Sequence, residues 1–190
     1  MKKYLQIALM IFCVSAVFTS CKDDDDSDDA AVQAYKLENE QAFAAKENDP
    51  DYQKISISGA GEDFVYAKKL KEGDGDPVYY TSHVNVYYRG WLATDTRNDY
   101  FDKREFEDGS PATFAVSPQY ATYDSYGNTI IGYPITGWTI ALQNMKVGDK
   151  WEVWIPQQLA YGTRERDGIP IYSALVFEIE VDGISAIVGK

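Results

Sequence analysis

The side chains that could carry conventional catalysis are few in this chain of 190 residues. The only histidine, His83, stands in a strand-like pattern beside Val84, where a lone histidine is usually structural or exposed. No GxSxG turn accompanies it, and the chain contains neither a P-loop nor a GxGxxG fingerprint. Its 30 aspartates and glutamates offer many carboxylate pairs for glycoside hydrolysis, but no spacing selects one. We therefore expect neither a catalytic triad nor a phosphate-binding loop.

Metal and cofactor sites also lack candidate ligands. The two cysteines, Cys13 and Cys21, both lie near the N-terminus. The acidic run at residues 23–29 has neither the glycine nor the spaced ligands of an EF-hand loop. A formal net charge of −12 argues against nucleic acid, whose binding needs a basic surface, and against a basic patch on anionic lipid. We expect no cofactor, no metal and no nucleic-acid partner.

Residues 1–20 have the features of a lipoprotein signal peptide. Lys2 and Lys3 precede a nearly apolar stretch that is too short for a comfortable membrane span. The stretch ends in Phe18-Thr19-Ser20-Cys21, which resembles a bacterial lipobox, although Phe18 stands where a smaller aliphatic residue is preferred. We expect lipidation of Cys21, so that the membrane is reached through the lipid anchor only. The alternative is an ordinary secretory signal cut near Ser20.

Residues 21–29 are dominated by aspartate and contain no apolar side chain that would anchor them to a core. We expect an extended acidic tether, because like charges repel one another. The Cys-Lys-Asp-Asp start resembles the acidic export tag of surface lipoproteins from Bacteroidota. This resemblance implies an outer-membrane or cell-surface lipoprotein. A plain spacer, on a lipoprotein that faces the periplasm, is the alternative.

The remaining pattern predicts an α+β domain behind a helical extension. Residues 30–46 are expected to form a helix that packs on the domain, and Gly59 and Gly61 mark a linker, so that the extension and linker cover 30–62. Strand-like alternation appears at residues 64–70, 84–88, 151–155 and 175–181. One short helix, ended by Gly148, is expected from apolar residues at helical spacing: Trp138, Ala141, Leu142 and Met145. We expect an antiparallel sheet that closes over this single helix.

Seven short motifs follow one another in an order that is specific as a set. They are Val86-Tyr87-Tyr88-Arg89-Gly90-Trp91-Leu92, Tyr100-Phe101-Asp102, Pro111-Ala112-Thr113-Phe114, Ile135-Thr136-Gly137-Trp138, Met145-Lys146-Val147-Gly148-Asp149-Lys150, Leu159-Ala160-Tyr161-Gly162 and Leu175-Val176-Phe177-Glu178. Together they resemble the FKBP domain of peptidyl-prolyl cis-trans isomerases over residues 63–185. The resemblance implies an antiparallel half-barrel wrapped around one short helix, with a hydrophobic cleft between them.

The resemblance also implies the site and its partners. Trp138 would form the floor of the cleft, the Ile135 N–H would hold a substrate carbonyl, and the Tyr161 hydroxyl would orient the peptide. The full set of implied site residues is Tyr88, Phe101, Asp102, Ile135, Trp138, Tyr161, Ile169 and Phe177. The implied partners are proline-containing unfolded or flexible polypeptides, and a macrolide-type compound as a pocket ligand. The implied function is folding of exported proteins in the cell envelope.

Because of three departures from the family pattern, other functions remain as alternatives. Ala112 stands where some members carry an aromatic residue, and Ile169-Pro170-Ile171-Tyr172 replaces the usual Ile-Pro-Pro stretch. Residues 117–133 form an insertion rich in tyrosine, which we expect to be a hairpin turning at Gly127-Asn128 with packed rings. The insertion is either a surface excursion or a partner-binding flap. The alternatives to an isomerase are a catalytically weak peptide-binding or chaperone module and a small-ligand-binding β-barrel.

Overall fold

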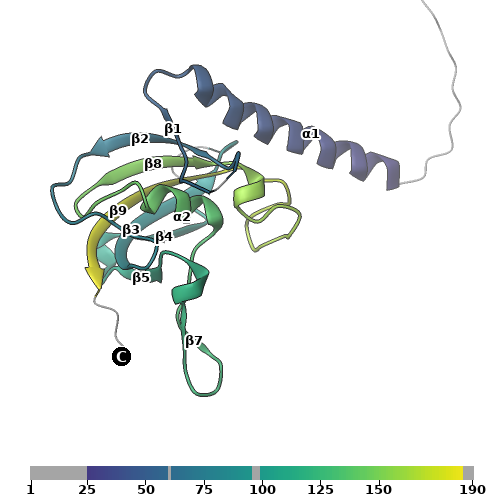
Figure 1. The fold of residues 1–190 in the computed structure, drawn as a ribbon. Coiled ribbons are helices and arrows are strands. Elements are labelled where there is room, and N and C mark those ends of the chain that lie inside the picture. Colours follow the sequence, from purple (N-terminus) through teal and green to yellow (C-terminus); the bar gives the residue numbers. More distant parts are fainter. Residues whose placement is uncertain (1–24, 60, 96–98, 186–190) are drawn as a thin grey trace, which may run out of the picture.

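The centre of the protein is an open, antiparallel sheet (Figure 1). The computed structural model describes residues 25–59, 61–95 and 99–185, so that the expected signal peptide and Cys21 lie outside the described residues. The seven strands are paired in the order β1-β2-β8-β9-β3-β4, and β5 also pairs with β3. Their bounds are β1 (Gln53–Ile55), β2 (Val65–Lys71), β3 (His83–Leu92), β4 (Asp102–Arg104), β5 (Ala112–Ala115), β8 (Lys150–Ile155) and β9 (Leu175–Ser185). The α+β half-barrel expected from the sequence is confirmed, and the sheet does not close into a barrel.

Helix α2 (Thr136–Leu142) lies in the hollow of this sheet, with all of its residues from Gly137 to Leu142 buried. A Cβ atom on residue 137 would lie 2.3 Å from Cγ2 of Ile155 on β8, which is well inside van der Waals contact. Glycine is therefore required where the helix meets the sheet. This close approach places the next residue, Trp138, at the centre of the domain.

Helix α2 ends earlier than the sequence pattern suggests, and the expectation that Gly148 ends it is wrong. The side-chain amides of Gln143 and Asn144 donate to the carbonyls of Thr139 and Ile140, at 3.0 and 2.9 Å. These local hydrogen bonds satisfy carbonyls that another helical turn would use. Gly148 instead lies in the turn that leads into β8.

The outer face of the sheet carries charges that pair across neighbouring strands. Glu178 on β9 is buried and lies opposite Arg89 of β3 and Glu152 of β8. Its Oε1 atom is 2.8 Å from Nη2 of Arg89 and 2.9 Å from Nζ of Lys150. Two cations thus compensate a carboxylate whose burial without partners would be costly.

Helix α1 (Asp25–Ala44) begins inside the segment expected to be an extended tether, so that expectation is wrong for residues 25–29. Acidic residue types are in general compatible with the first turn of a helix, because the helix dipole is positive there. Within the residues that the structure describes, no helix is long and apolar enough to cross a membrane. The described part of the chain also contains four single-turn 3-10 helices: η1 (Ala45–Asn48), η2 (Phe106–Asp108), η3 (Pro118–Tyr120) and η4 (Gln157–Leu159).

The expected packing of the N-terminal helix on the domain is confirmed. The contacts come from every fourth residue of α1, which places them on one face. The Tyr35 hydroxyl is 2.8 Å from Oγ of Ser173, and Oδ1 of the buried Asn39 accepts the backbone N–H of Ala174 at 2.9 Å. Phe43 lies against Tyr66, with ring centroids 5.0 Å apart. The expected linker then contributes a strand that the pattern did not indicate, because β1 pairs with β2 at the sheet edge.

Residues 117–133, called the insertion hairpin below, form the two-stranded sheet of β6 (Thr122–Tyr123) and β7 (Thr129–Ile131). The predicted hairpin is confirmed, and Gly127 adopts a φ of +84° in its turn, whereas Asn128 needs no positive φ. The expectation that the tyrosine rings pack is wrong for Tyr123, Tyr126 and Tyr133, which are exposed. A two-stranded ribbon with no layer packed on it cannot bury such rings.

We expect the Asn39→Ala variant to lose about 1–3 kcal/mol of free energy of unfolding, because the buried N–H of Ala174 would lose its acceptor. Urea unfolding followed by circular dichroism measures the change. Gln41→Ala is the matched control, since Gln41 is an exposed amide on the same helix. Equal stability of the two variants would mean that α1 does not stabilise the domain through this contact.

Candidate functional site

A cavity of about 670 Å³ lies between α2 and the inner face of the sheet. Its lining comes from separate elements: β3 supplies Tyr88, β5 supplies Phe114, α2 supplies Trp138 and β9 supplies Phe177. Phe101 closes it from the segment that enters β4. The walls are therefore aromatic, and residues far apart in the sequence meet in them.

The buried indole of Trp138 makes the floor of this cavity. Its ring centroid lies 5.2 Å from Tyr88, 5.7 Å from Phe114 and 5.2 Å from Phe177, all edge to face. This arrangement of aromatic rings is electrostatically favourable and holds the indole in one orientation. The Nε1 atom of Trp138 is buried and has no hydrogen-bond partner among the described residues.

Two tyrosine hydroxyls and the Asp102 carboxylate are among the polar groups of the cavity. The Tyr88 hydroxyl donates to Oδ2 of the exposed Asp102 at 2.9 Å. Burial, followed by this hydrogen bond and the negative charge of Asp102, raises the pKa of Tyr88. Burial also raises the pKa of Tyr161, against the opposing effect of Arg166. Both tyrosines therefore present neutral hydroxyl groups at neutral pH.

A backbone amide at the start of α2 is available to a ligand. Ile135 precedes the helix with a ψ of 155°, and its carbonyl accepts the N–H of Trp138 at 3.0 Å. The N–H of Ile135 has no acceptor among the described residues. Because Ile135 lines the cavity, a carbonyl lying over the indole of Trp138 finds a donor beside it.

The structure brings together seven of the eight predicted site residues. The seven that line the cavity are Tyr88, Phe101, Asp102, Ile135, Trp138, Tyr161 and Phe177. Ile169 is not among the lining residues, and its side chain is buried in the same hydrophobic core as Trp138 and Phe177. Its backbone exchanges two hydrogen bonds with Arg166, at 3.1 and 2.9 Å, which closes a tight turn over the core. The backbone of Ile169 thus helps to hold this loop, and its role as a site residue stays a prediction.

Comparison with known proteins assigns the family. Residues 77–182, more than half of the chain, match the family described as FKBP-type peptidyl-prolyl cis-trans isomerase. The chain belongs to this family. It is 33% identical to the FKBP-type 22 kDa peptidyl-prolyl cis-trans isomerase of Escherichia coli over 156 residues, which are 79% of this chain and 65% of that protein. This chain thus spans less than two thirds of that relative's length.

Two further similarities agree with the FKBP assignment. The chain is 31% identical over 114 residues to a protein named FK506-binding protein from Neisseria meningitidis, covering 59% of this chain and 88% of that one. A solved peptidyl-prolyl cis-trans isomerase from Pseudomonas syringae superposes with a TM-score of 0.60 at 28% identity, covering 81% of this chain and 96% of that chain. The sheet and the single buried helix are therefore those of an FKBP domain.

Sequence reasoning missed several residues of the FKBP cavity. Phe114 had a local signal, because it follows Ala112 by two positions and so shares its strand face. It contacts both Tyr88 and Trp138 and supplies an aromatic wall close to the position where Ala112 is small. Most of the other lining residues had no local signal, because they lie outside the seven motifs: Ile57, Asp63, Tyr80, Pro118, Tyr133, Pro134, Thr139, Ile140, Arg164 and Arg166.

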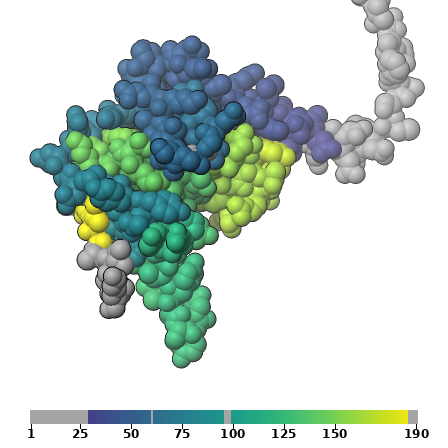
Figure 2. All heavy atoms as spheres, in the orientation of Figure 1, coloured from purple at the N-terminus to yellow at the C-terminus, as the bar shows by residue number. Residues whose placement is uncertain are grey.

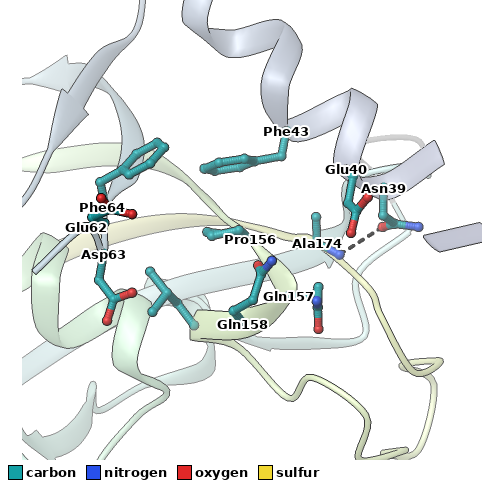
Figure 3. A pocket seen from close by; sticks show the side chains of 11 residues that line it. Asn39, Glu40, Phe43, Glu62, Asp63, Phe64, Pro156, Gln157, Gln158 and Ala174 are labelled. Atoms are coloured by element: carbon teal, nitrogen blue, oxygen red, sulfur yellow. Dashed lines mark hydrogen bonds between the residues drawn. The ribbon is translucent and has the colours of Figure 1, made fainter. Parts of the chain in front are cut away.

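A second cavity, of about 380 Å³, lies at the seam between α1 and the domain (Figure 3). Phe43 and Phe64 line it, and the hydrogen bond from Ala174 to Asn39 crosses its edge. Asp63 lines this cavity as well as the aromatic one. No group of three or more histidine, cysteine, aspartate or glutamate side chains in the described ranges is arranged to hold a metal ion.

We expect the Phe101→Ala variant to lower kcat/KM for isomerisation of proline tetrapeptides by about 10- to 100-fold, since a buried aromatic contact contributes about 1.5–3 kcal/mol. Thermal unfolding should stay cooperative, because Phe101 is only half-buried. Phe106→Ala is the control, since Phe106 is a phenylalanine exposed outside the aromatic cavity. Trp138→Ala is a poorer test because aromatic-to-alanine changes in a core cost about 3–5 kcal/mol of stability. Unchanged kinetics in folded Phe101→Ala would exclude Phe101 from the substrate site.

The raised pKa of Tyr88 predicts that its contribution to the free energy of unfolding depends on pH. An unfolded tyrosine ionises near pH 10, whereas folded Tyr88 stays protonated above that value. Stability from this difference is fully present below about pH 10 and is lost as the pH rises toward the folded pKa. The difference in Tm between the wild type and Tyr88→Phe should therefore shrink from pH 9 to pH 11. A Tm difference that stays constant between pH 9 and pH 11 would contradict the raised pKa of Tyr88.

Proposed function

We propose that this protein is a peptidyl-prolyl cis-trans isomerase that acts on proline-containing segments of unfolded or flexible polypeptides. The observation that carries the proposal is the aromatic cavity floored by Trp138, with the free N–H of Ile135 at its edge. A proline ring fits such a cavity because it is apolar and carries no N–H to be left unpaired. The carbonyl that follows the proline then accepts from Ile135.

The cavity favours the twisted form of the X–Pro bond over the planar forms. Rotation has to cross a barrier of about 18–20 kcal/mol that arises from amide resonance. At the twisted transition state the carbonyl and the nitrogen are less conjugated, so the group is less dipolar and needs less hydration. A water-excluding aromatic site therefore binds the transition state more tightly than the ground state, and this difference accelerates the reaction. No nucleophile or acid–base pair is needed.

The same cavity fits a macrolide-type ligand, as the name of the Neisseria relative suggests for that protein. The rings of Tyr88, Phe101 and Phe177 would contact its apolar body. The Tyr88–Asp102 pair would stand at the polar edge of such a ligand. FK506 should then compete with proline peptides for the site.

A protease-coupled assay with tetrapeptides of the X–Pro type tests the activity directly. We expect the protein to accelerate isomerisation well above the uncatalysed rate, whose relaxation takes tens to hundreds of seconds. FK506 should abolish the acceleration. Tight peptide binding without acceleration would instead identify a catalytically weak peptide-binding or chaperone module.

We further propose that the protein works in the cell envelope on exported proteins that are folding. The support is the sequence of its first 29 residues: the charged and apolar signal, the lipobox-like Phe18-Thr19-Ser20-Cys21 and the acidic run. In this proposal Cys21 carries the lipid, and the outer membrane or cell surface is the location. A periplasm-facing lipoprotein is the alternative.

We expect wild-type protein to fractionate with membranes and Cys21→Ser to yield soluble protein or uncleaved precursor. Fractionation, gel mobility and metabolic labelling with a fatty acid measure the change. Cys13→Ser is the matched control, because Cys13 would leave with the signal peptide. Identical fractionation and mobility of Cys21→Ser and wild type would contradict the anchor, and protease treatment of whole cells separates the two membrane faces.

A further inference from the structure

The insertion hairpin stands away from the domain as an unsupported projection (Figure 2). We propose that it is a second binding surface, which takes apolar, uncharged segments of a non-native polypeptide whose proline occupies the aromatic cavity. This inference rests on the proposed isomerase function and deepens it, because it names how a protein client differs from a short peptide as a substrate.

The first support is the exposure of large apolar side chains on the hairpin. Tyr126 is 89% exposed, Ile130 65% and Tyr123 52%. Single exposed apolar residues are common on protein surfaces, but three within nine residues of one projecting ribbon are a cluster. Such clusters mark sites where another molecule is bound.

The second support is the near absence of charge. Asp124 is the only charged residue within residues 117–133, in a chain whose formal net charge is −12. Its carboxylate accepts the backbone N–H groups of Tyr126 and Asn128 and the side-chain amide of Asn128, each at 2.8 Å. These hydrogen bonds lower the pKa of Asp124, so its charge is held within the turn. The rest of the hairpin offers rings, methyl groups and backbone to a neutral segment.

The third support is that the base of the hairpin is fixed to the domain. Nε2 of the buried His83 on β3 is 2.7 Å from the carbonyl oxygen of Tyr120, and the N–H of Ala115 donates to Gly132 at 2.8 Å. The Tyr120 ring packs edge to face on Tyr80, at 6.2 Å. A surface held in place loses little conformational entropy when it binds a ligand.

The fourth support is continuity with the aromatic cavity. Pro118, Tyr133 and Pro134, at the two ends of the insertion, line that cavity, as does Tyr80 beside them. A chain whose proline lies on Trp138 therefore leaves the cavity along the base of the hairpin. Apolar segments flanking that proline are exposed only while the client is non-native, which makes them the fitting occupant. Tyrosine suits this use because its rigid ring contacts many apolar shapes.

The test compares two substrates for three forms of the full chain in mild detergent. The forms are the wild type, the hairpin variant Tyr126→Ser/Ile130→Ser, and the control variant Leu37→Ser/Phe106→Ser. Leu37 and Phe106 are also exposed, but they lie outside the hairpin, and neither they nor Tyr126 and Ile130 line the aromatic cavity. The substrates are a proline tetrapeptide and a reduced, carboxymethylated ribonuclease whose refolding in high salt is limited by prolyl isomerisation.

We expect the hairpin variant to retain tetrapeptide turnover within about twofold and to lose about tenfold in kcat/KM on the ribonuclease, as truncation of aromatic contacts at an interface commonly does. The control variant should match the wild type on both substrates. Equal losses on both substrates would overturn the proposal by showing that the hairpin shapes the cavity. Full activity on both would overturn it by showing that the hairpin contacts no client.

The same three proteins and two substrates distinguish two further outcomes. A wild type that turns over neither substrate would reject the proposed function itself, and binding of fluorescently labelled carboxymethylated ribonuclease would still test the hairpin separately. Loss of concentration-dependent association in the hairpin variant, with unchanged ribonuclease kinetics, would replace the client by a second copy of this chain. Sedimentation velocity measures that association.

Discussion

Helix α2 can lie in the hollow of the sheet only because residue 137 has no side chain. The Cγ2 atom of Ile155 occupies the place where a Cβ atom would be. The contact brings the next residue, Trp138, under the centre of the sheet, where rings from β3, β5 and β9 surround it. The packing of the core and the shape of the cavity are therefore consequences of one helix–sheet contact. A helix held further out would leave the indole without these walls.

The aromatic cavity combines an apolar floor with a limited set of polar groups. Aromatic rings form its floor and walls. Its polar lining includes Asp102, the Tyr88 and Tyr161 hydroxyls, the Ile135 N–H and the charged side chains of Asp63, Arg164 and Arg166. Charges of the central strands lie on the opposite face of the sheet, where Glu178 is paired with Arg89 and Lys150. Separation of the two faces keeps these charges away from the aromatic floor of the cavity. An apolar floor favours a reaction whose transition state is less polar than its ground state.

The insertion hairpin extends this site with a different kind of surface. The cavity recognises one residue type through shape and desolvation, whereas the hairpin presents exposed rings without charge or a fixed partner. His83, the single histidine, belongs to this part of the structure, because it bonds the carbonyl of Tyr120 at the hairpin base. A residue that the sequence offered only as an isolated strand histidine thus acquires a positioning role through the fold.

The sequence by itself determined the main strands, the buried helix and most of the aromatic residues of the cavity. Period-two alternation located the main strands, helical spacing around Trp138 located α2, and the ordered motifs named seven of the cavity residues. These features are local, or repeat at fixed intervals along the chain, so neighbouring residues alone specify them. The hairpin was also local, because a glycine in its turn and β-forming residues on one arm specify it.

Only the tertiary structure decided where distant segments meet. It brought Ile57 from the linker and Asp63 from the start of the domain to the cavity, and it paired the three residues of β1 with the sheet edge. It also left Tyr123, Tyr126 and Tyr133 of the hairpin exposed, because no second layer of the described residues covers them. A short strand and a rim residue depend on partners far away in the chain, and their own sequence carries no periodic signal. Which residues line the cavity therefore depends on packing between segments. The residues of one segment cannot specify that packing alone.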